Sequence, residues 1–349
     1  MDYLKDYHHI RGFNYTPSSA FNDVGFWRDY DSTLVERELT YAERLGLNSA
    51  RIFLSYVVYE RDPQRFLERV RHFLRAAHAR GISTMVVVWD SCFDETIPAY
   101  ETQKNGWIPN PGVARLGTDF WANGERYCAD LVEALRDKPG LLMWDVMNEP
   151  RMTSWLSGSE AEARTQVIWA FVRHFCAVIK RLDPQHPITV GVHVADDIAQ
   201  VGQHVDVITC HDYLPTRAAI RAHIRQILDF CEAYRKPALL SEIGCLARSN
   251  PYDVTLEICQ EMGIGWYLWE LMIGASMWRD IHGVVYPDGT VRDPAIAAAI
   301  RGFFRRRAGD IVLPNVDKEG EATRTLRLAS EWLASDEPAY AAGLQILER

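Results

Sequence analysis

The chain has 349 residues, of which 48% are hydrophobic and 24% are charged, and its formal net charge is −9. This is an ordinary globular composition, and the length suits one α/β barrel with insertions. The negative charge excludes a nucleic-acid partner, which would need a basic face. No apolar run approaches the ~20 residues of a membrane span, so no membrane partner is expected.

The seven cysteines form no CxxC pair, which excludes zinc-ribbon and thioredoxin-type sites. Cys176 and Cys210 lie inside apolar runs, so we expect reduced core thiols in a reducing compartment. The first residues show no basic region followed by an apolar stretch, the mark of a signal peptide. We therefore expect a cytoplasmic protein, or a secreted one if a leader was removed. The sequence leaves the oligomeric state open.

Strand and helix patterns alternate about eight times along the chain. The expected strands are Ile10–Tyr15, Ser49–Leu54, Thr84–Trp89, Leu141–Val146, Ile188–Val192, Val205–Thr209, Ala238–Ser241 and Gly265–Trp269. The expected helices are Thr33–Leu45, Pro63–Arg80, Asp119–Arg136, Glu160–Arg181, Arg217–Tyr234, Pro251–Glu261 and Pro294–Arg306. Asp62, Asn250 and Asp293 each precede a proline, which predicts an N-cap followed by the first helical residue.

Continuous apolar strands such as Met85–Trp89 are typical of a parallel sheet that is buried on both faces. Eight alternations favour a closed barrel over an open, doubly wound sheet. No GxGxxG follows the first strand, so a dinucleotide-binding fold loses its main support. We expect an α/β fold in which residues 1–311 form a (β/α)8 TIM barrel. Residues 312–349 are expected to form a short C-terminal helical extension packed on the barrel.

Two glutamates follow expected strands of this barrel. Glu149 stands in Trp-Asp-Val-Met-Asn-Glu-Pro after the fourth strand, and Glu242 stands in Leu-Ser-Glu-Ile-Gly after the seventh. The site of such a barrel lies at the carboxyl ends of its strands, where both side chains would meet. Acid-assisted cleavage of a glycosidic bond requires two carboxyl groups, one to protonate the leaving oxygen and one to attack or stabilise the sugar carbon.

The order of the motifs resembles the clan A retaining glycoside hydrolases, most of all the cellulase-like family 5 group, over about 300 residues. Asn148-Glu149-Pro matches the acid/base motif, and Ser-Glu242-Ile-Gly matches the nucleophile motif. Three further positions match, namely Arg51 after the second strand, His211-x-Tyr213 after the sixth and Trp269 after the eighth. Family members commonly carry a histidine after the third strand, where this chain has Trp89 and Asp90.

The resemblance implies that Glu149 is the acid/base and Glu242 the nucleophile. Glu242 should be ionised and held by hydrogen bonds from Arg51 and Tyr213. Glu149 should be protonated, with its pKa raised by burial and by the negative charge of Glu242. Asn148 is expected to bond the sugar 2-hydroxyl.

The remaining expected substrate contacts come from strand ends and loops. His211 is expected to orient Glu149 or the sugar, and Trp269 to offer a flat face to the sugar ring. The residues expected to bind carbohydrate are Arg51, Trp89, Asp90, Asn148, His211, Tyr213, Trp269 and Trp278. The strand ends are poor in metal-ligand spacings, and we expect no metal and no cofactor. His193 is interpreted as structural.

The sequence thus predicts a retaining β-glycoside hydrolase that acts through a covalent glycosyl-enzyme intermediate. The long loop after the third strand and the stretch Trp278–Gly289 favour short β-linked oligosaccharides or glycosides. An endo-acting β-glucanase or mannanase that cleaves polysaccharide is the alternative. A non-catalytic carbohydrate-binding barrel is the other alternative, and a transglycosylase would use the same residues.

Overall fold

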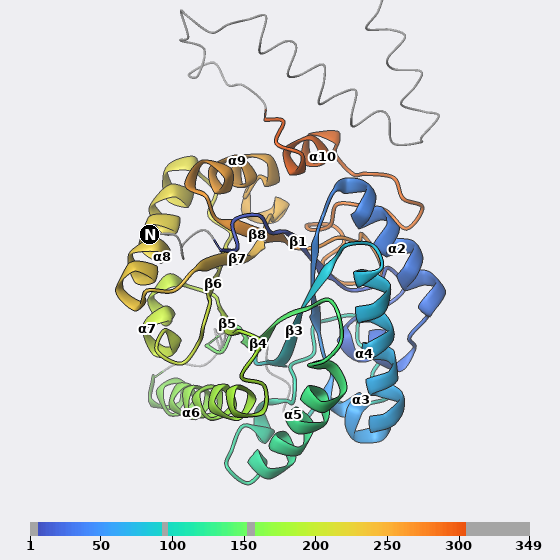
Figure 1. Ribbon diagram of the computed structural model, residues 1–349, viewed down its shortest axis with the longest axis vertical. Helices are drawn as coiled ribbons and strands as arrows, with labels where there is room; N and C mark the ends of the chain where they lie inside the picture. The colour runs from blue at the N-terminus through green and yellow to red at the C-terminus, as the bar shows by residue number, and fades with distance from the viewer. Residues whose placement is uncertain (1–5, 93–96, 152–157, 305–349) are drawn as a thin grey trace, which may run out of the picture. The chain divides into compact units, whose positions relative to one another are not determined.

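The computed structural model of the chain describes residues 6–92, 97–151 and 158–304. Eight parallel strands close into a barrel in chain order, with the last paired to the first, as the alternating pattern predicts (Figure 1). The strands are β1 (Arg11–Tyr15), β2 (Ser49–Phe53), β3 (Ser83–Asp90), β4 (Leu141–Asn148), β5 (Ile188–Val192), β6 (Ile208–Asp212), β7 (Ala238–Ile243) and β8 (Gly265–Leu268). The expected helical extension, residues 312–349, lies outside the described residues.

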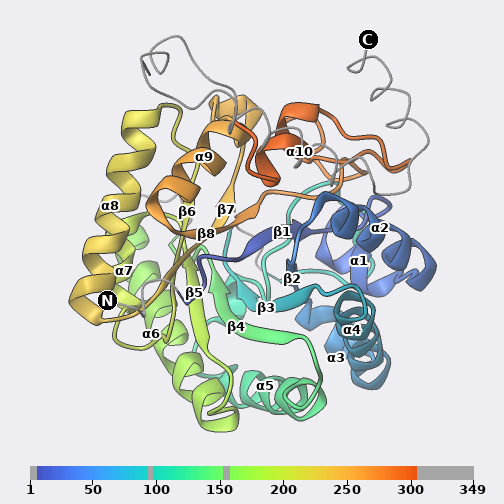
Figure 2. The same ribbon diagram turned by 45° about the horizontal axis from the view of Figure 1, so that its top comes forward.

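Helices surround the barrel, as the turned view in Figure 2 makes plain. They are α1 (Asp23–Arg28), α2 (Ser32–Leu45), α3 (Tyr56–Arg61), α4 (Pro63–His78), α5 (Trp121–Leu135), α6 (Gly158–Leu182), α7 (Ile198–Val201), α8 (Arg217–Tyr234), α9 (Tyr252–Met262) and α10 (Pro294–Ile300). The sequence pattern missed α1 and α3, because helices of six residues are too short to show a helical period. None of the described helices combines the length and the apolar character that crossing a membrane requires.

Two of the three proline-linked helix starts are confirmed. The Asp62 carboxylate accepts from the backbone N–H of Arg65, and Asp293 caps α10 in the same way. The prediction for Asn250 was wrong. Its side chain instead accepts from the N–H of Gly244 and donates to the carbonyl of Leu214, so it ties the loop after β7 to the loop after β6.

The barrel interior is apolar toward the amino ends of the strands. A small cluster of buried side chains fills this end, with Tyr267 at its centre and its hydroxyl 2.7 Å from the hydroxyl of Ser49. Gly12 leaves room for this ring, because a Cβ there would stand 2.2 Å from it. The floor is therefore a packed core, and ligands can enter only from the opposite, carboxyl end of the strands. All seven cysteines are buried free thiols, as expected.

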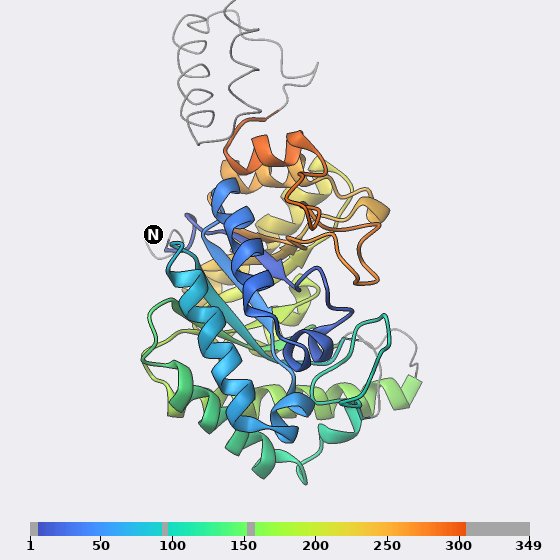
Figure 3. The ribbon, with the colours of Figure 1, turned by 90° about the vertical axis from the view of Figure 1, so that its right-hand side faces the viewer.

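Four strands run further than their apolar patterns indicate. β3 extends to Asp90, β4 extends to Asn148, β6 is shifted to Ile208–Asp212, and β7 extends to Ile243. The patterns ended early because each added segment contains a polar side chain, namely Asp90, Asn148, His211 with Asp212, and Glu242. The strand pairing also shifts register there, between Asp145 and Asn148 and between Leu240 and Ile243. The loops after β1, β3 and β8 project from this end, on the right of Figure 3.

Glu270, just beyond β8, gives the barrel a pH-dependent stability. Burial raises its pKa to about 8, and the Ser276 hydroxyl donates a hydrogen bond of 3.5 Å to its carboxylate. The unfolded chain has a glutamate pKa of about 4.3, so between about pH 4.3 and about pH 8 only the folded protein keeps this proton. The free energy of unfolding should therefore fall as the pH rises through this window.

We predict that Glu270→Gln removes this loss, because glutamine cannot ionise. Relative to wild type, the variant should gain stability from about pH 5 to about pH 8 in urea denaturation. Asp137→Asn, at an exposed position, serves as the control and should leave the pH dependence unchanged. A Glu270→Gln protein whose stability runs parallel to wild type across the window would contradict the prediction.

Candidate active site

The guanidinium of Arg51 lies at the centre of the upper barrel and is fully buried. All five of its N–H donors are used. Nε and Nη2 each donate a hydrogen bond to Oδ2 of Asp145, at 2.9 and 2.8 Å, and Nη1 donates one to Oε1 of Glu242 at 2.7 Å. The remaining two donors bond the amide oxygens of Asn14 and Asn148 at 3.0 and 2.7 Å. Burial opposes the charge, but Asp145 and Glu242 outweigh it and raise the pKa of Arg51.

Sequence reasoning missed Asp145 and Gly191, on which this arrangement depends. Asp145 is fully buried inside β4, and its other oxygen accepts from the backbone N–H of Gly191 at 3.0 Å. Its signal in the sequence was a carboxylate inside an apolar strand, which is rare unless the charge is paired. Gly191 left no such signal, because its role is to leave space for side chains of other strands.

Glu242, at the end of β7, is held at both carboxylate oxygens. Arg51 bonds Oε1, and the Tyr213 hydroxyl donates to Oε2 at 2.7 Å, as the sequence predicts. Nδ1 of His211 lies 3.3 Å from the same Oε2. Glu242 is 4% exposed, so its carboxylate has almost no contact with bulk water.

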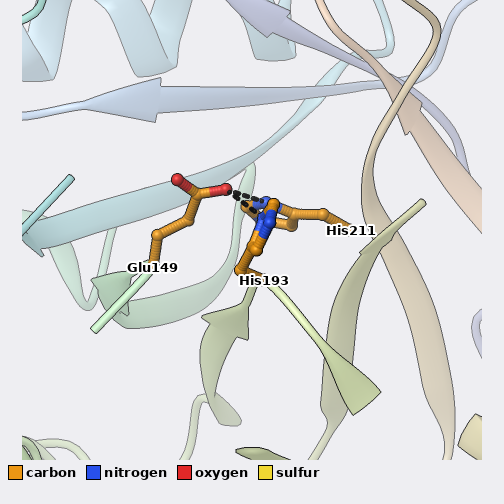
Figure 4. Close-up of side chains that lie close together, drawn as sticks. All are labelled: Glu149, His193 and His211. Atoms are coloured by element: carbon orange, nitrogen blue, oxygen red, sulfur yellow. Dashed lines mark hydrogen bonds and ion pairs between the residues drawn. The ribbon is translucent and has the colours of Figure 1, made fainter. Parts of the chain in front are cut away.

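Glu149 is bound by two imidazoles at one oxygen. Nδ1 of His211 lies 2.8 Å from its Oε1 and Nδ1 of His193 lies 3.0 Å from it, while the other oxygen points away from both rings (Figure 4). The φ angle of Glu149 is 42°, a left-handed value that side chains rarely adopt. Such backbone strain gathers at functional sites. His193 directly follows β5 and binds this strained residue. It therefore belongs to the site and not to the scaffold alone.

The pKa expected for Glu149 was wrong in direction. Burial does raise it, but the hydrogen bonds and positive charge of His193 and His211 outweigh burial and hold the pKa of Glu149 well below its usual value. The hydrogen bond with Glu149 in turn raises the pKa of His193. The convergence of these two imidazoles, one after β5 and one in β6, depends on the fold and could not be predicted from local sequence.

Asp90 supports the site from behind and does not reach the cavity, contrary to expectation. One carboxylate oxygen accepts from the N–H of Cys92, and the other accepts from the Trp107 indole at 2.7 Å. That second oxygen also lies 3.4 Å from the side-chain nitrogen of Asn148. Burial raises the pKa of Asp90 well above its usual value. Asp90 thus positions Asn148 and Trp107, and both line the cavity.

The prediction that Trp89 binds substrate was also wrong, because its side chain faces away from the site. Its ring is fully buried against Tyr127 of α5 and against Phe171 and Phe175 of α6. Val88 lies in the same outer core, so two successive residues point outward and the strand alternation breaks. A sugar therefore cannot touch Trp89.

An open cavity of about 470 Å³ contains both glutamates. Aromatic rings from three segments line it, namely Trp107 from the loop after β3, Tyr213 from the loop after β6, and Trp269 and Trp278 after β8. The peptide bond between Trp269 and the next residue is cis. The other lining residues are Cys92, Asn148, Arg248 and His282. Arg248 and His282 were missed because loop residues acquire their place only through the fold.

Glu149, His193 and His211 also form a set that could hold a metal ion, since their ligand atoms all lie within 4.8 Å of one another. Carboxylate and imidazole are common ligands of zinc. The three groups already satisfy one another by hydrogen bonds. Among the described residues, this is the one cluster of three such side chains with that spacing.

Comparisons with known proteins agree with this geometry. The sequence model of the cellulase family (glycosyl hydrolase family 5) matches residues 16–274. Mannan endo-1,4-beta-mannosidase F of Aspergillus clavatus is 28% identical over 130 residues, which are 36% of this chain and 26% of that protein. The putative mannan endo-1,4-beta-mannosidase 9 of Oryza sativa subsp. japonica is 26% identical over 44% of this chain and 47% of its own. The chain thus spans less than half the length of these curated relatives.

Solved structures share the fold. A GH5_18 protein from Streptomyces cattleya, in complex with Manb1-4GlcNAc, superposes with a TM-score of 0.62 at 20% identity, over 82% of this chain and 78% of that one. An exo-beta-1,4-mannosidase from Opitutaceae bacterium strain TAV5 also gives 0.62, at 18% identity, over 92% and 67%.

We predict that Gly191→Ala disturbs the central charge network. A Cβ at this position would stand 2.7 Å from Nη2 of Arg51 and 3.0 Å from Oδ2 of Asp145, and neither buried group has room to move. The free energy of unfolding should fall by about 1–3 kcal/mol, as for other overpacked cores. In the control Gly25→Ala, the new Cβ meets only an Asn22 oxygen at 3.6 Å and should cost nothing. Equal stability of the two variants would refute the assigned role of Gly191.

Proposed function

Because the chain belongs to glycosyl hydrolase family 5, we propose that it hydrolyses β-glycosidic bonds with net retention, with Glu149 as acid/base and Glu242 as nucleophile. The observation that carries the proposal is the pair of buried carboxylates on either side of His211 in one aromatic-lined cavity.

The spacing of the two carboxylates supports retention. Nδ1 of His211 lies 2.8 Å from Oε1 of Glu149 and 3.3 Å from Oε2 of Glu242. These two oxygens are therefore separated by no more than the sum of those distances, about 6 Å, which leaves less room than the ~6.5–9.5 Å of inverting enzymes. At such a spacing the second carboxylate can reach the sugar itself, with no water between.

In the first step, an oxygen of Glu242 attacks the anomeric carbon while Glu149 gives its proton to the glycosidic oxygen. The bond to the leaving group breaks, the leaving group departs as an alcohol, and the sugar remains as an ester of Glu242. Arg51 and Tyr213 hold the attacking carboxylate in place. Glu149 needs a proton for this step, and the imidazole of His193, 3.0 Å away, is a neighbour that can supply it.

In the second step, water replaces the departed alcohol. Glu149 is now a carboxylate and takes a proton from the water, whose oxygen attacks the anomeric carbon and releases Glu242. The hydrogen bonds from His193 and His211 stabilise Glu149 in this ionised form. Asn148 lines the cavity and would bond the sugar 2-hydroxyl, a contact that strengthens in the transition state.

We propose short β-linked mannosides as substrates. The curated relatives are named mannan endo-1,4-beta-mannosidases, and the structural neighbours include an exo-beta-1,4-mannosidase and a protein in complex with Manb1-4GlcNAc. Trp107 and Trp278 come from two loops and line one cavity with Trp269. This arrangement favours a pocket for a terminal sugar over an open cleft. An endo-acting mannanase is the second candidate, favoured by the names of the curated relatives. Release of mannose only from chain ends would separate the two.

We predict that Glu242→Gln abolishes turnover of aryl β-mannosides, because an amide cannot form the glycosyl ester. The loss should reach several orders of magnitude with the fold intact, as judged by thermal unfolding. A non-catalytic carbohydrate-binding barrel would show saturable binding of the sugar and no turnover in either protein. Near-wild-type turnover by Glu242→Gln would overturn the nucleophile assignment.

We predict a different outcome for Glu149→Ala. An activated leaving group such as dinitrophenolate needs no proton, so the glycosyl-enzyme should still form, while its hydrolysis slows because no base remains. Added azide should restore turnover and yield the β-configured glycosyl azide, identified by NMR. An α-configured azide product would indicate inversion, and failure of azide to raise the rate would remove Glu149 from the role of acid/base.

A further inference from the structure

A second cavity, of about 620 Å³, opens beside the one that contains the two glutamates. It lies at the ends of β5 and β6, and His193, His211, His223 and Gln226 contribute to its wall. Arg248 and Tyr213 line both cavities. The two spaces therefore meet at this pair of side chains.

The proposed reaction indicates which part of the substrate each cavity would hold. Glu149 must face the glycosidic oxygen, so the leaving group lies on its side of the cleft. The imidazoles of His193 and His211 bind Glu149, and both of them also line the second cavity. A leaving group that extends past Glu149 therefore enters the second cavity and passes Arg248.

Arg248 is an exposed cation at this junction. Its guanidinium carbon lies 4.9 Å from the centre of the Tyr213 ring, whose hydroxyl bonds Glu242. No carboxylate stands within ion-pair distance of it among the residues described. This cation–π contact with Tyr213 orients the guanidinium and leaves its N–H donors for a ligand.

The acidic groups of the second cavity have partners of their own. Asp212, beneath the wall, bonds His223 at 2.9 Å, and Asp196 accepts from the side-chain nitrogen of Gln226 at 2.6 Å. The positive groups near the junction are Arg248 and His193 when protonated. The wall at the junction thus offers a cation that forms no ion pair with any carboxylate in the described part of the chain.

We propose that Arg248 binds an oxyanion, a carboxylate or a phosphate ester, carried by the leaving group of the substrate. The planar guanidinium fork matches both groups through paired hydrogen bonds. The inference rests on the proposed function and adds to it the chemical class of the leaving group. Arg248 is on this view a specificity-determining residue, and it takes no part in proton transfer.

The test compares para-substituted phenyl leaving groups that differ in charge. Its probes are aryl β-mannosides, or the aryl β-glycoside that turns over fastest, with a 4-carboxyphenyl, a 4-phosphonooxyphenyl and a neutral 4-methoxycarbonylphenyl leaving group. For each protein, kcat/KM on each charged probe is divided by kcat/KM on the neutral ester. This ratio cancels any general loss of activity. Wild type should prefer at least one charged probe by roughly tenfold, the effect of one charge-assisted hydrogen bond.

In Arg248→Met this ratio should fall roughly tenfold, because the variant lacks the cation that distinguishes a charged leaving group from the neutral ester. Arg248→Lys should recover part of the wild-type ratio. Arg221→Met serves as the matched control, because Arg221 is on α8 and pairs with Glu261 outside both cavities. Its ratio should equal that of wild type. The charged probe with the higher ratio identifies the oxyanion.

Turnover without any preference for a charged probe would overturn this inference and leave the proposed function standing. A preference that survives in Arg248→Met would also overturn it, since another group would then bind the anion. No turnover of any aryl glycoside by wild type would overturn the proposed function, and this inference with it.

Discussion

The buried charge of Arg51 is the constraint on which the site depends. A guanidinium taken out of water is stable only when all its donors are paired and its charge is balanced. Here Asp145 and Glu242 supply the balance, and two asparagines take the remaining donors. Because these partners come from β1, β4 and β7, one side chain ties together strands on different sides of the barrel. The position of Glu242 follows from that requirement.

The two glutamates of the cavity differ because their partners differ. Glu242 faces a guanidinium, which keeps its charge at every physiological pH. Glu149 instead faces two imidazoles, and its hydrogen bond raises the pKa of one of them, His193. This difference in partners suits the division of roles that the proposed double displacement requires, and His211 links the two groups by approaching both.

The errors in the sequence-based reading share a physical cause. Trp89 was expected at the site because it ends the third strand, but the barrel turns two successive residues of β3 outward. Register shifts in β4 and β7 likewise decide that Asn148 and Glu242 face inward. Such irregularities re-aim side chains next to active sites, and they depend on neighbouring strands. The residues near a site cannot specify them by their own pattern.

The sequence by itself determined the eightfold repeat, the order of the strands, and the two glutamates with Arg51 and Tyr213. These features are local, because hydrophobic period and motif spacing lie within a few residues of each other. Only the tertiary structure decided the roles of Asp145, Gly191 and His193, the removal of Trp89 from the cavity, and the place of Arg248 between two cavities. Those roles arise where distant strands converge, and a space or a shared hydrogen bond leaves no trace in any one segment.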